Sequence, residues 1–349
     1  MGCAFRFCPQ TTPYPSLPLH PFFLLMHACS WTAQVGMFTI TLRSLEWAFA
    51  KKPLRRYESP ADGRQQRAPV ERHLSIPNVL LDAFDLTCNY RGIGWSWSKN
   101  PFPAASARSA SIASILAKFF LKFLVFDVCL YLVQHLRPSV NVPAGDTIFD
   151  PTLSPLARWA FAALYTLCAG VVVYTNVDML YHLATLVGRV ILRQPAWQWP
   201  PLSDRPWMAT SVEDFWSFRW HQFLRHVFVV YGARPGGELL GRPGALLGAF
   251  TVSAVMHDLG MWALGRGTEF RTAGGFFLFM GVGVALERAF KGWTGRRVGG
   301  FWGWAWTMVW TLGWGTLMID AWARRGLVAC DFCPDWLRPG KLFIDTIRQ

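Results

Sequence analysis

Charged residues are scarce in this sequence: they make up 16% of its 349 residues, against roughly 25% in an average soluble domain. Hydrophobic residues reach 52%, with 19 Trp and 27 Phe, and the mean hydropathy is positive. This composition argues against two soluble domains, which the length alone would permit, and favours one polytopic membrane unit. The chain also contains no tandem repeat and no low-complexity tract.

Clustered cysteines are missing as well. The eight cysteines are spread along the chain, which is not the pattern of a disulfide scaffold. Cys330 and Cys333 form a lone CxxC, without the second ligand pair at short spacing that a zinc site needs. We therefore expect no metal site and interpret this pair as incidental, with a disulfide as the alternative.

The charges that are present are mostly positive, and the formal net charge is +13. In a membrane protein the first explanation is cytoplasmic loops rich in Lys and Arg, so we expect no nucleic-acid partner. A basic rim that attracts a phosphorylated substrate is the alternative explanation.

Apolar segments of membrane-spanning length recur along the chain. A bilayer core of about 30 Å needs about 20 helical residues. We predict spans over residues 19–42, 113–136, 157–177, 244–264, 273–290 and 299–322, with a further helix or half-helix up to residue 194. For the first segment a signal peptide is the alternative, but its apolar part exceeds the roughly 7 to 15 residues of an h-region. The prediction is an all-α, polytopic integral membrane protein with six to eight transmembrane helices.

Three segments of different character divide the chain. Residues 1–42 hold the N-terminal segment and the first predicted span, and residues 113–349 form the membrane-embedded core. Residues 43–112 are polar and basic and lack a helical apolar period, so we predict a cytosolic loop there.

The predicted loop contains RGIGWSW at residues 91–97. Gly92 and Gly94 would let the backbone approach a ligand or another segment closely. A loop over the cytosolic mouth of a site fits this sequence, and so does a turn held at the interface by Trp95 and Trp97.

One amphipathic helix is predicted over residues 210–230, TSVEDFWSFRWHQFLRHVFVV. Thr210 with Glu213, or Ser211 with Asp214, has the spacing of a capping box, so the helix should begin there. One face then carries a polar stripe at steps of three and four residues, formed by Asp214, Ser217, His221 and Arg225. An interfacial helix with a solvated face would show the same pattern.

Residues 250–264, FTVSAVMHDLGMWAL, place His257 and Asp258 in the middle of an apolar segment. An ionisable group at mid-membrane costs about 3 kcal/mol or more unless it faces a polar cavity or a partner. Two imidazoles, His221 on a polar helix face and His257 in a span, would converge on an internal aqueous reaction chamber. The alternative for His257 is a packed histidine bonded to a neighbouring carbonyl. Asp178 and His182 form a further polar pair, for which we favour structural packing.

Three segments resemble the motifs of one family, the wax synthase-like membrane-bound O-acyltransferases. DFWSFRWHQFLR at residues 214–225 resembles the D-F-W-x-x-R-W-H-x-x-x-R signature of that family, and SAVMHDLG at residues 253–260 resembles the segment with its central histidine. RGIGWSW is similar to a segment of fungal members. The family often has Glu where this chain has Asp258.

The resemblance implies acyl transfer from a coenzyme A thioester to a hydroxyl within the membrane. A neutral imidazole with a pKa of about 6.5 suits removal of the alcohol proton, and we assign this role to His257. We expect His221 to orient the thioester or donate to its carbonyl, where a donor contributes about 3 kcal/mol. The residues expected to shape the chamber and bind substrate are Asp214, Trp216, Arg219, Trp220, Arg225 and Asp258. Of these, Arg219 and Arg225 are the candidates for phosphate contacts, because Arg presents a fork to such groups.

The fungal segment favours transfer of acetyl from acetyl-CoA to a terpenoid or meroterpenoid intermediate of secondary metabolism. Acyl-CoA would be a co-substrate, with no bound cofactor. The other partners would be the hydroxylated acceptor and membrane lipid. The expected location is the endoplasmic reticulum membrane. Wax ester synthesis from a long-chain alcohol is the alternative within this class. An alternative of another class is a polytopic transporter or lipid-binding membrane protein, in which relay histidines would recur along several spans.

Overall fold

The computed structural model describes residues 36–50, 52–57, 76–98, 110–329 and 335–348. Within these ranges the chain is helical, and an isolated bridge between Arg56 and Trp95 is the one β-type pairing. The all-α prediction is therefore confirmed. The predicted first span lies largely outside the described residues, which begin in a helix over residues 36–48, and the CxxC also lies outside them.

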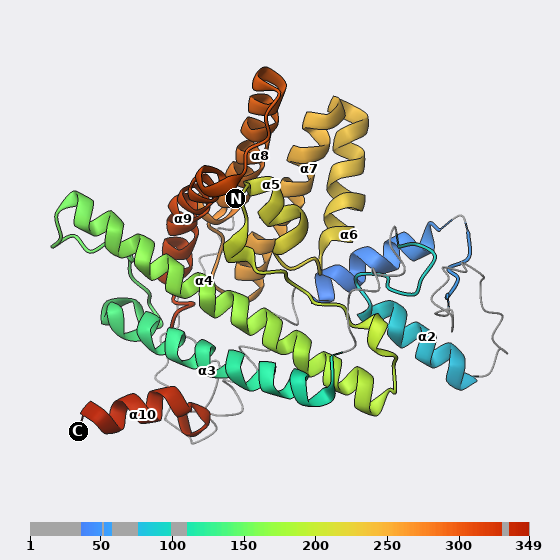
Figure 1. Cartoon of the computed structure of the whole chain (residues 1–349), viewed down its shortest axis with the longest axis horizontal. Coiled ribbons are helices and arrows are strands. Elements are labelled where there is room, and N and C mark those ends of the chain that lie inside the picture. Colours follow the sequence, from blue (N-terminus) through green and yellow to red (C-terminus); the bar gives the residue numbers. More distant parts are fainter. Residues whose placement is uncertain (1–35, 51, 58–75, 99–109, 330–334, 349) are drawn as a thin grey trace, which may run out of the picture.

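Two long helices run side by side through the molecule (Figure 1). They are α3 (Ile112–Leu136) and α4 (Pro155–Leu186). Ser111 caps α3 by accepting a hydrogen bond from the Ser114 N–H at 3.2 Å, and a proline opens α4. The chain continues from α4 through the π turn η2 (Val187–Ile191), so the predicted span and half-helix are one continuous helix.

A helical hairpin stands on the other side of α4 (Figure 1). Its first arm contains α6 (Arg225–Phe228), the π turn η6 (Val229–Ala233) and the start of α7 (Arg234–Ala263). The helix is interrupted at Gly241, with φ 65° and ψ −149°, and the second arm returns from residue 242. The arms touch through glycines, because a Cβ at Gly232 would collide with the carbonyl of Gly248. Such small-residue contacts are typical of membrane helices.

The helices α8 (Gly275–Thr294) and α9 (Gly300–Arg324) follow, near the predicted spans. Among the described residues three segments are long and apolar enough to cross a membrane: Pro155–Ile191, Arg225–Ala263 and Phe270–Thr294. The second of these is the hairpin, so its 39 residues do not form a single span. Both α3 and α9 are also long enough, but α3 carries Lys118, Lys122 and Asp127, and α9 is rich in Trp and Gly.

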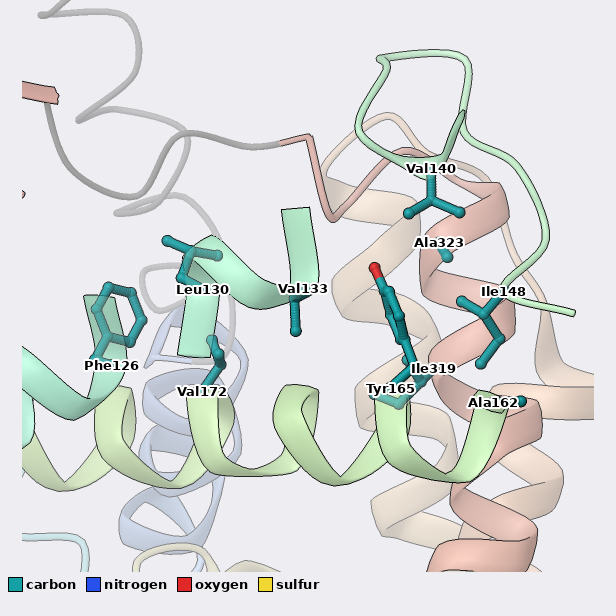
Figure 2. Packing of buried hydrophobic residues seen from close by; sticks show 10 residues of the cluster. All are labelled: Phe126, Leu130, Val133, Val140, Ile148, Ala162, Tyr165, Val172, Ile319 and Ala323. Atoms are coloured by element: carbon teal, nitrogen blue, oxygen red, sulfur yellow. The ribbon is translucent and has the colours of Figure 1, made fainter. Parts of the chain in front are cut away.

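A buried apolar cluster joins α3, α4 and α9 (Figure 2). Tyr165 of α4 is its largest fully buried side chain and lies opposite Ile319 of α9. The cluster consists of Phe126, Leu130, Val133, Val140, Ile148, Ala162, Tyr165, Val172, Ile319 and Ala323. This core fixes the angle at which α9 meets α4, and the two helices form adjoining walls of the cavity described below.

Two shorter helices lie at the periphery. Residues 76–88 form α2 (Ile76–Cys88), so the prediction of a loop throughout residues 43–112 is wrong at this point. Asp82 and Asp85 of this helix bind Arg56, a distant partner that no local sequence period reveals. At the other end, α10 (Pro339–Arg348) packs against α3, where Asp127 accepts from the Gly340 N–H at 2.7 Å.

Candidate functional site

A cavity of about 580 Å³ lies between α4, the hairpin, α8, α9 and residues 206–222. We call it the central cavity. Its wall is mainly apolar and aromatic, as in most small-molecule sites. The polar and charged side chains on the wall are Thr166, Tyr174, Ser217, His221, Gln222, Arg225, Arg242, Ser253, His257, Arg288 and Thr311. Within the described part of the chain, no three His, Cys, Asp or Glu side chains come together to hold a metal ion.

The central cavity brings together five of the predicted site residues: Trp216, Trp220, His221, Arg225 and His257. A second cavity, of about 470 Å³, lies between α2 and the residues that follow η2. It contains no histidine and none of the predicted site residues, and its Arg56 is already bound to two aspartates. The central cavity is therefore the candidate site.

One face of the second hairpin arm lines the cavity from end to end. The residues follow helical spacing: Arg242, Ala245, Leu246, Ala249, Phe250, Ser253 and His257. From Arg242 to His257 the chain advances 15 residues, which is about 22 Å along the helix. The cavity is therefore elongated, with a guanidinium near one end and an imidazole near the other.

His257 has a defined tautomer. Its Nδ1 lies 2.7 Å from the carbonyl oxygen of Ser253. A carbonyl can only accept, so Nδ1 carries the proton and Nε2 carries the lone pair of the neutral ring. The ring also stacks on Phe277, with 4.1 Å between the ring centroids. This is the tautomer in which Nε2 can act as a base.

The chain over residues 210–230 is not the single helix that the polar stripe predicts. It begins as expected, because Ser211 Oγ accepts from the Asp214 N–H at 2.9 Å and opens α5 (Val212–Asp214). A π turn, η5 (Phe215–Arg219), then ends at Trp220 in an extended conformation, and helix resumes only at Arg225. Local π turns of this kind are frequent at functional sites.

Tertiary contacts explain this departure. The carboxylate of Glu287, buried in α8, accepts from the backbone N–H of Val212 at 2.6 Å and of Glu213 at 3.0 Å. The large rings of Trp216 and Trp220 pack into the cavity wall, and this packing outweighs the local preference for a helix. Glu287 was not among the predicted site residues. Its only signal in the sequence is an acid within an apolar segment.

His221 lies in the extended link after η5. Its ring is beside Trp220, at 5.1 Å between centroids, and its buried Nδ1 has no hydrogen-bond partner among the described residues. Burial lowers the pKa of His221 to about 4, and the charge of a protonated His257 nearby lowers it as well. At neutral pH His221 is therefore uncharged, and a neutral imidazole can donate one hydrogen bond and accept another.

Trp216 connects the surroundings of the two histidines. Its ring lies 6.2 Å from that of Trp220, which adjoins His221, and 6.0 Å from that of Phe277, which stacks on His257. Its Nε1 is buried and has no hydrogen-bond partner among the described residues. The aromatic contacts hold both imidazoles on one continuous wall.

Three of the predicted site residues do not line the cavity. Asp214 accepts from Arg219 Nε at 2.6 Å, and this pair closes the π turn. Asp258 accepts from the Glu269 N–H at 2.7 Å and ties the end of α7 to the residues before the π turn η7 (Phe270–Gly274). Adjacent residues on a helix point about 100° apart, which is why Asp258 does not share the direction of His257.

Two arginines that sequence reasoning missed lie at the end opposite His257. They are Arg242, which opens the second hairpin arm, and Arg288 of α8. The helices α7 and α8 run antiparallel, with Gly281 against Phe250, so Arg288 is level with Arg242. Arg288 binds Glu213 at 2.6 Å, whereas Arg242 forms no ion pair with any described carboxylate.

Arg225 lies elsewhere along the cavity. The hairpin arms pair Gly232 with Gly248 and Gly236 with Gly244, so Arg225 is level with the His257 end of the second arm. The three arginines on the wall are therefore divided between its two ends. This division depends on which residues of neighbouring helices lie side by side, and that alignment cannot be read from the sequence.

RGIGWSW lies away from the central cavity. Trp95 is 3% exposed and donates from Nε1 to Asp85 at 2.8 Å, and Arg91 donates to the carbonyl of Pro200 at 3.0 Å. Gly92 and Gly94 have φ values of 66° and 81°, which favour glycine. Together with the helix over residues 36–48 these contacts form what we call the N-terminal cluster: Arg43, Glu46, Arg56, Asp85, Trp95, Trp97 and His226.

Comparison with known proteins supports the resemblance. Residues 199–279 match the model of the membrane bound O-acyl transferase family. This range contains both histidine segments, and the match confirms the resemblance inferred from them. No solved structure is significantly similar to this chain.

Characterised relatives share parts of the chain. The O-mevalon transferase yanI of Aspergillus niger is 24% identical over 287 residues, which cover 74% of this chain and 64% of that protein. The long-chain-alcohol O-fatty-acyltransferase of Simmondsia chinensis is 33% identical over 99 residues, which cover 26% of this chain and 28% of that protein. The acetyltransferase spyB of Aspergillus fumigatus is 32% identical over 127 residues, which cover 34% of this chain and 22% of that protein. The matches therefore span less than two thirds of the length of these relatives.

Proposed function

We propose that this chain, a relative of the membrane bound O-acyl transferase family, transfers an acyl group from a coenzyme A thioester to a hydroxyl within the membrane. One observation supports this most directly. His257 lies on the wall of a largely apolar cavity, with Nδ1 bound to the Ser253 carbonyl and the lone pair therefore on Nε2. His221, neutral at pH 7, lies on the same wall.

The proposed reaction assigns a role to each imidazole. Nε2 of His257 removes the proton from the acceptor hydroxyl, and the hydroxyl oxygen attacks the carbonyl carbon of the thioester. The carbon–sulfur bond then breaks, the proton passes to the departing sulfur, and the products are an ester and a free thiol. His221 donates to the carbonyl oxygen as it becomes negative, an interaction of about 3 kcal/mol for one well-placed donor. No acyl-enzyme is required.

The opposite end of the cavity suits the phosphates of coenzyme A. In coenzyme A about 13 bonds separate the sulfur from the first phosphorus. An extended chain covers roughly 3.5 Å for every three such bonds, so these two atoms can be about 15 Å apart. Arg242 lies about 22 Å along α7 from His257, and its own side chain spans much of the remaining distance. We therefore assign the phosphate contacts to Arg242 and Arg288, in place of Arg219 and Arg225. Arg225 and Trp220 would contact the reacting end.

For the substrates we propose acetyl-CoA and a hydroxylated terpenoid or meroterpenoid intermediate, in the endoplasmic reticulum membrane of a fungus. The similarity to the fungal acetyltransferase and O-mevalon transferase supports this choice. Wax ester synthesis is the second candidate, supported by the similarity to the long-chain-alcohol O-fatty-acyltransferase and by the apolar cavity wall.

Free-thiol release tests the proposal. Membranes carrying the wild type or His257→Ala would receive acetyl-CoA or palmitoyl-CoA, each with a hydroxylated terpenoid panel or a long-chain alcohol. Release with acetyl-CoA and a terpenoid, lost in the variant, is the expected result. Release only with palmitoyl-CoA and the fatty alcohol would establish the second candidate. A transporter would release no thiol under any pairing.

A further inference from the structure

A cluster of charged side chains lies between α3 and α4, apart from both proposed catalytic histidines. Lys122 of α3 forms an ion pair with Asp178 of α4. Their side chains are 20% and 8% exposed. His182 Nδ1 lies 2.6 Å from the carbonyl oxygen of Asp178 and 3.8 Å from its carboxylate. The polar pair expected from the sequence is therefore a group of three, and charges inside a membrane-capable helix are usually functional.

Tyr174 connects this cluster to the central cavity. Lys122 Nζ donates to the Tyr174 hydroxyl at 3.1 Å and lies 4.7 Å from the centroid of its ring. Tyr174 lines the cavity one helical turn before Asp178. Its ring lies 6.4 Å from that of Trp220, and Trp220 in turn lies 5.1 Å from His221. The phenol therefore reaches from the buried ion pair to the part of the wall that carries His221.

The hydrogen-bond chemistry of this phenol is constrained. A lysine ammonium has three donors and no acceptor, so the Tyr174 oxygen accepts from Lys122 and its own proton must be donated elsewhere. Among the described residues Lys122 is the one hydrogen-bond partner of this hydroxyl. A cation that donates to the phenol oxygen also polarises the O–H bond and strengthens it as a donor.

We propose that Tyr174 donates a hydrogen bond to the carbonyl oxygen of the bound thioester, and that Lys122 and Asp178 are positioning residues for this donor. The inference rests on the proposed acyl transfer. The thioester is chosen over the alcohol because Tyr174 and His221 flank the same ring, Trp220. Tyr174 makes and breaks no covalent bond. Its hydrogen bond strengthens as the carbonyl oxygen becomes negative.

The chain offers a matched control on the same helix. Tyr181 lies two turns further along α4, but its hydroxyl donates to the carbonyl of Pro200 at 2.7 Å and it does not line the cavity. We expect Tyr174→Phe to lower kcat by about 100-fold, the usual effect of losing one such donor, with little change in the KM of the alcohol. Tyr181→Phe should leave kcat within about twofold of the wild type.

Binding of two unreactive thioethers separates this role from a general loss of structure. S-(2-oxopropyl)-coenzyme A keeps a carbonyl, whereas S-propyl-coenzyme A has none. Tyr174→Phe should weaken binding of the ketone analogue by about 10-fold, which corresponds to one hydrogen bond of about 1.4 kcal/mol. Binding of S-propyl-coenzyme A should be unchanged. Equal binding of the ketone analogue by Tyr174→Phe and Tyr181→Phe would overturn the proposal.

A double-variant cycle tests the positioning residues. Lys122→Met alone would leave Asp178 buried without its cation, so Lys122→Met is combined with Asp178→Asn. This pair should lower kcat by about 10-fold in the wild type and cause no further loss in Tyr174→Phe, because the donor is already absent. Additive losses in the two backgrounds would overturn the positioning role.

The outcomes distinguish this inference from the proposed function. If the wild type releases no thiol from any acyl thioester, acyl transfer itself is wrong. If the wild type turns over and Tyr174→Phe behaves like Tyr181→Phe, only the role of Tyr174 is wrong. A raised KM for the alcohol, with unchanged binding of the ketone analogue, would also overturn the proposal, because the phenol would then contact the acceptor.

Discussion

Two regions of this molecule are built from the same residue types and use them differently. The central cavity and the N-terminal cluster both combine histidine, arginine and tryptophan. His221 lies on the cavity wall, whereas His226, only five residues later, belongs to the N-terminal cluster. His226 Nε2 lies 2.9 Å from Glu46, which also accepts from Arg43 at 2.9 Å. In the described part of the chain, His221 forms no ion pair with a carboxylate, and its Nδ1 has no hydrogen-bond partner.

The electrostatics of the two regions differ accordingly. Burial raises the pKa of Glu46, but the contacts with His226 and Arg43 outweigh it and hold this pKa below its usual value. Burial without an acid lowers the pKa of His221 to about 4. The N-terminal cluster therefore pairs charges with each other, whereas the cavity keeps His221 uncharged. Residue type alone does not separate a cluster of ion pairs from a candidate reactive site. The partners of each side chain do.

The largest expected effect is on the reacting end of the cavity. His257→Ala should lower kcat by about 1,000-fold, because it removes the proposed general base. Thiol release by purified protein measures this loss, and unchanged solubility and α-helical content provide the control for folding. Turnover within about tenfold of the wild type would remove the base assignment and weaken the contrast between the regions.

The second effect concerns stability and pH. The folded protein holds the pKa of His221 at about 4, below the unfolded value of about 6.5, so the unfolded chain binds more protons between these values. Stability attributable to this group is complete above pH 6.5 and is lost as the pH falls towards 4. Between pH 6.5 and 5 the loss should be about 2 kcal/mol.

His221→Gln removes this titration. The fall in Tm between pH 7 and 5 should therefore be smaller in His221→Gln than in the wild type. An equal fall in both proteins would contradict the lowered pKa of His221.

A third prediction concerns the phosphate end. Arg242→Ala should raise the KM for acyl-CoA by about 10-fold and change kcat little, because one charge-assisted contact contributes about 1.4 kcal/mol. The increase should shrink at high salt, since Arg242 is exposed. Arg234→Ala, in the first hairpin arm and off the cavity wall, is the matched control. Equal KM values for the two variants would contradict the phosphate assignment.

The smallest effect should come from the N-terminal cluster. His226→Ala removes the partner of Glu46 and should lower the stability by about 1 to 2 kcal/mol, while kcat per folded molecule stays unchanged. Thermal unfolding in detergent and thiol release measure the two quantities. A large drop in kcat at unchanged Tm would show that the two regions are not separate in function.

Much of the site could be predicted from local spacing. The second hairpin arm keeps one helical face over its whole length, so His257 and the small residues around it follow the expected period. The link between Trp220 and Arg225 could not be predicted, because the packing of Trp216 and Trp220 and the distant carboxylate of Glu287 decide its conformation. Arg242 was missed because its place depends on which residues of neighbouring helices are level.

The fold shows the same division between local and distant causes. The segments that became α3, α8 and α9 were predicted within a few residues, because length and hydropathy suffice for buried helices. The helix α2 was missed, since the partner of its aspartates, Arg56, lies well outside it in sequence. The prediction of a span over residues 244–264 did not include the hairpin whose tip is at Gly241.

The glycine contacts of the hairpin have a consequence for substrate length. Backbone touches backbone at Gly232–Gly248 and Gly236–Gly244, so the second arm cannot slide along the first without a collision. The separation between the arginine end and His257 is therefore fixed by the number of residues in one helix. Under the proposed phosphate and base assignments, a carrier arm shorter or longer than the pantetheine of coenzyme A would place its acyl carbon out of register with the His257 ring.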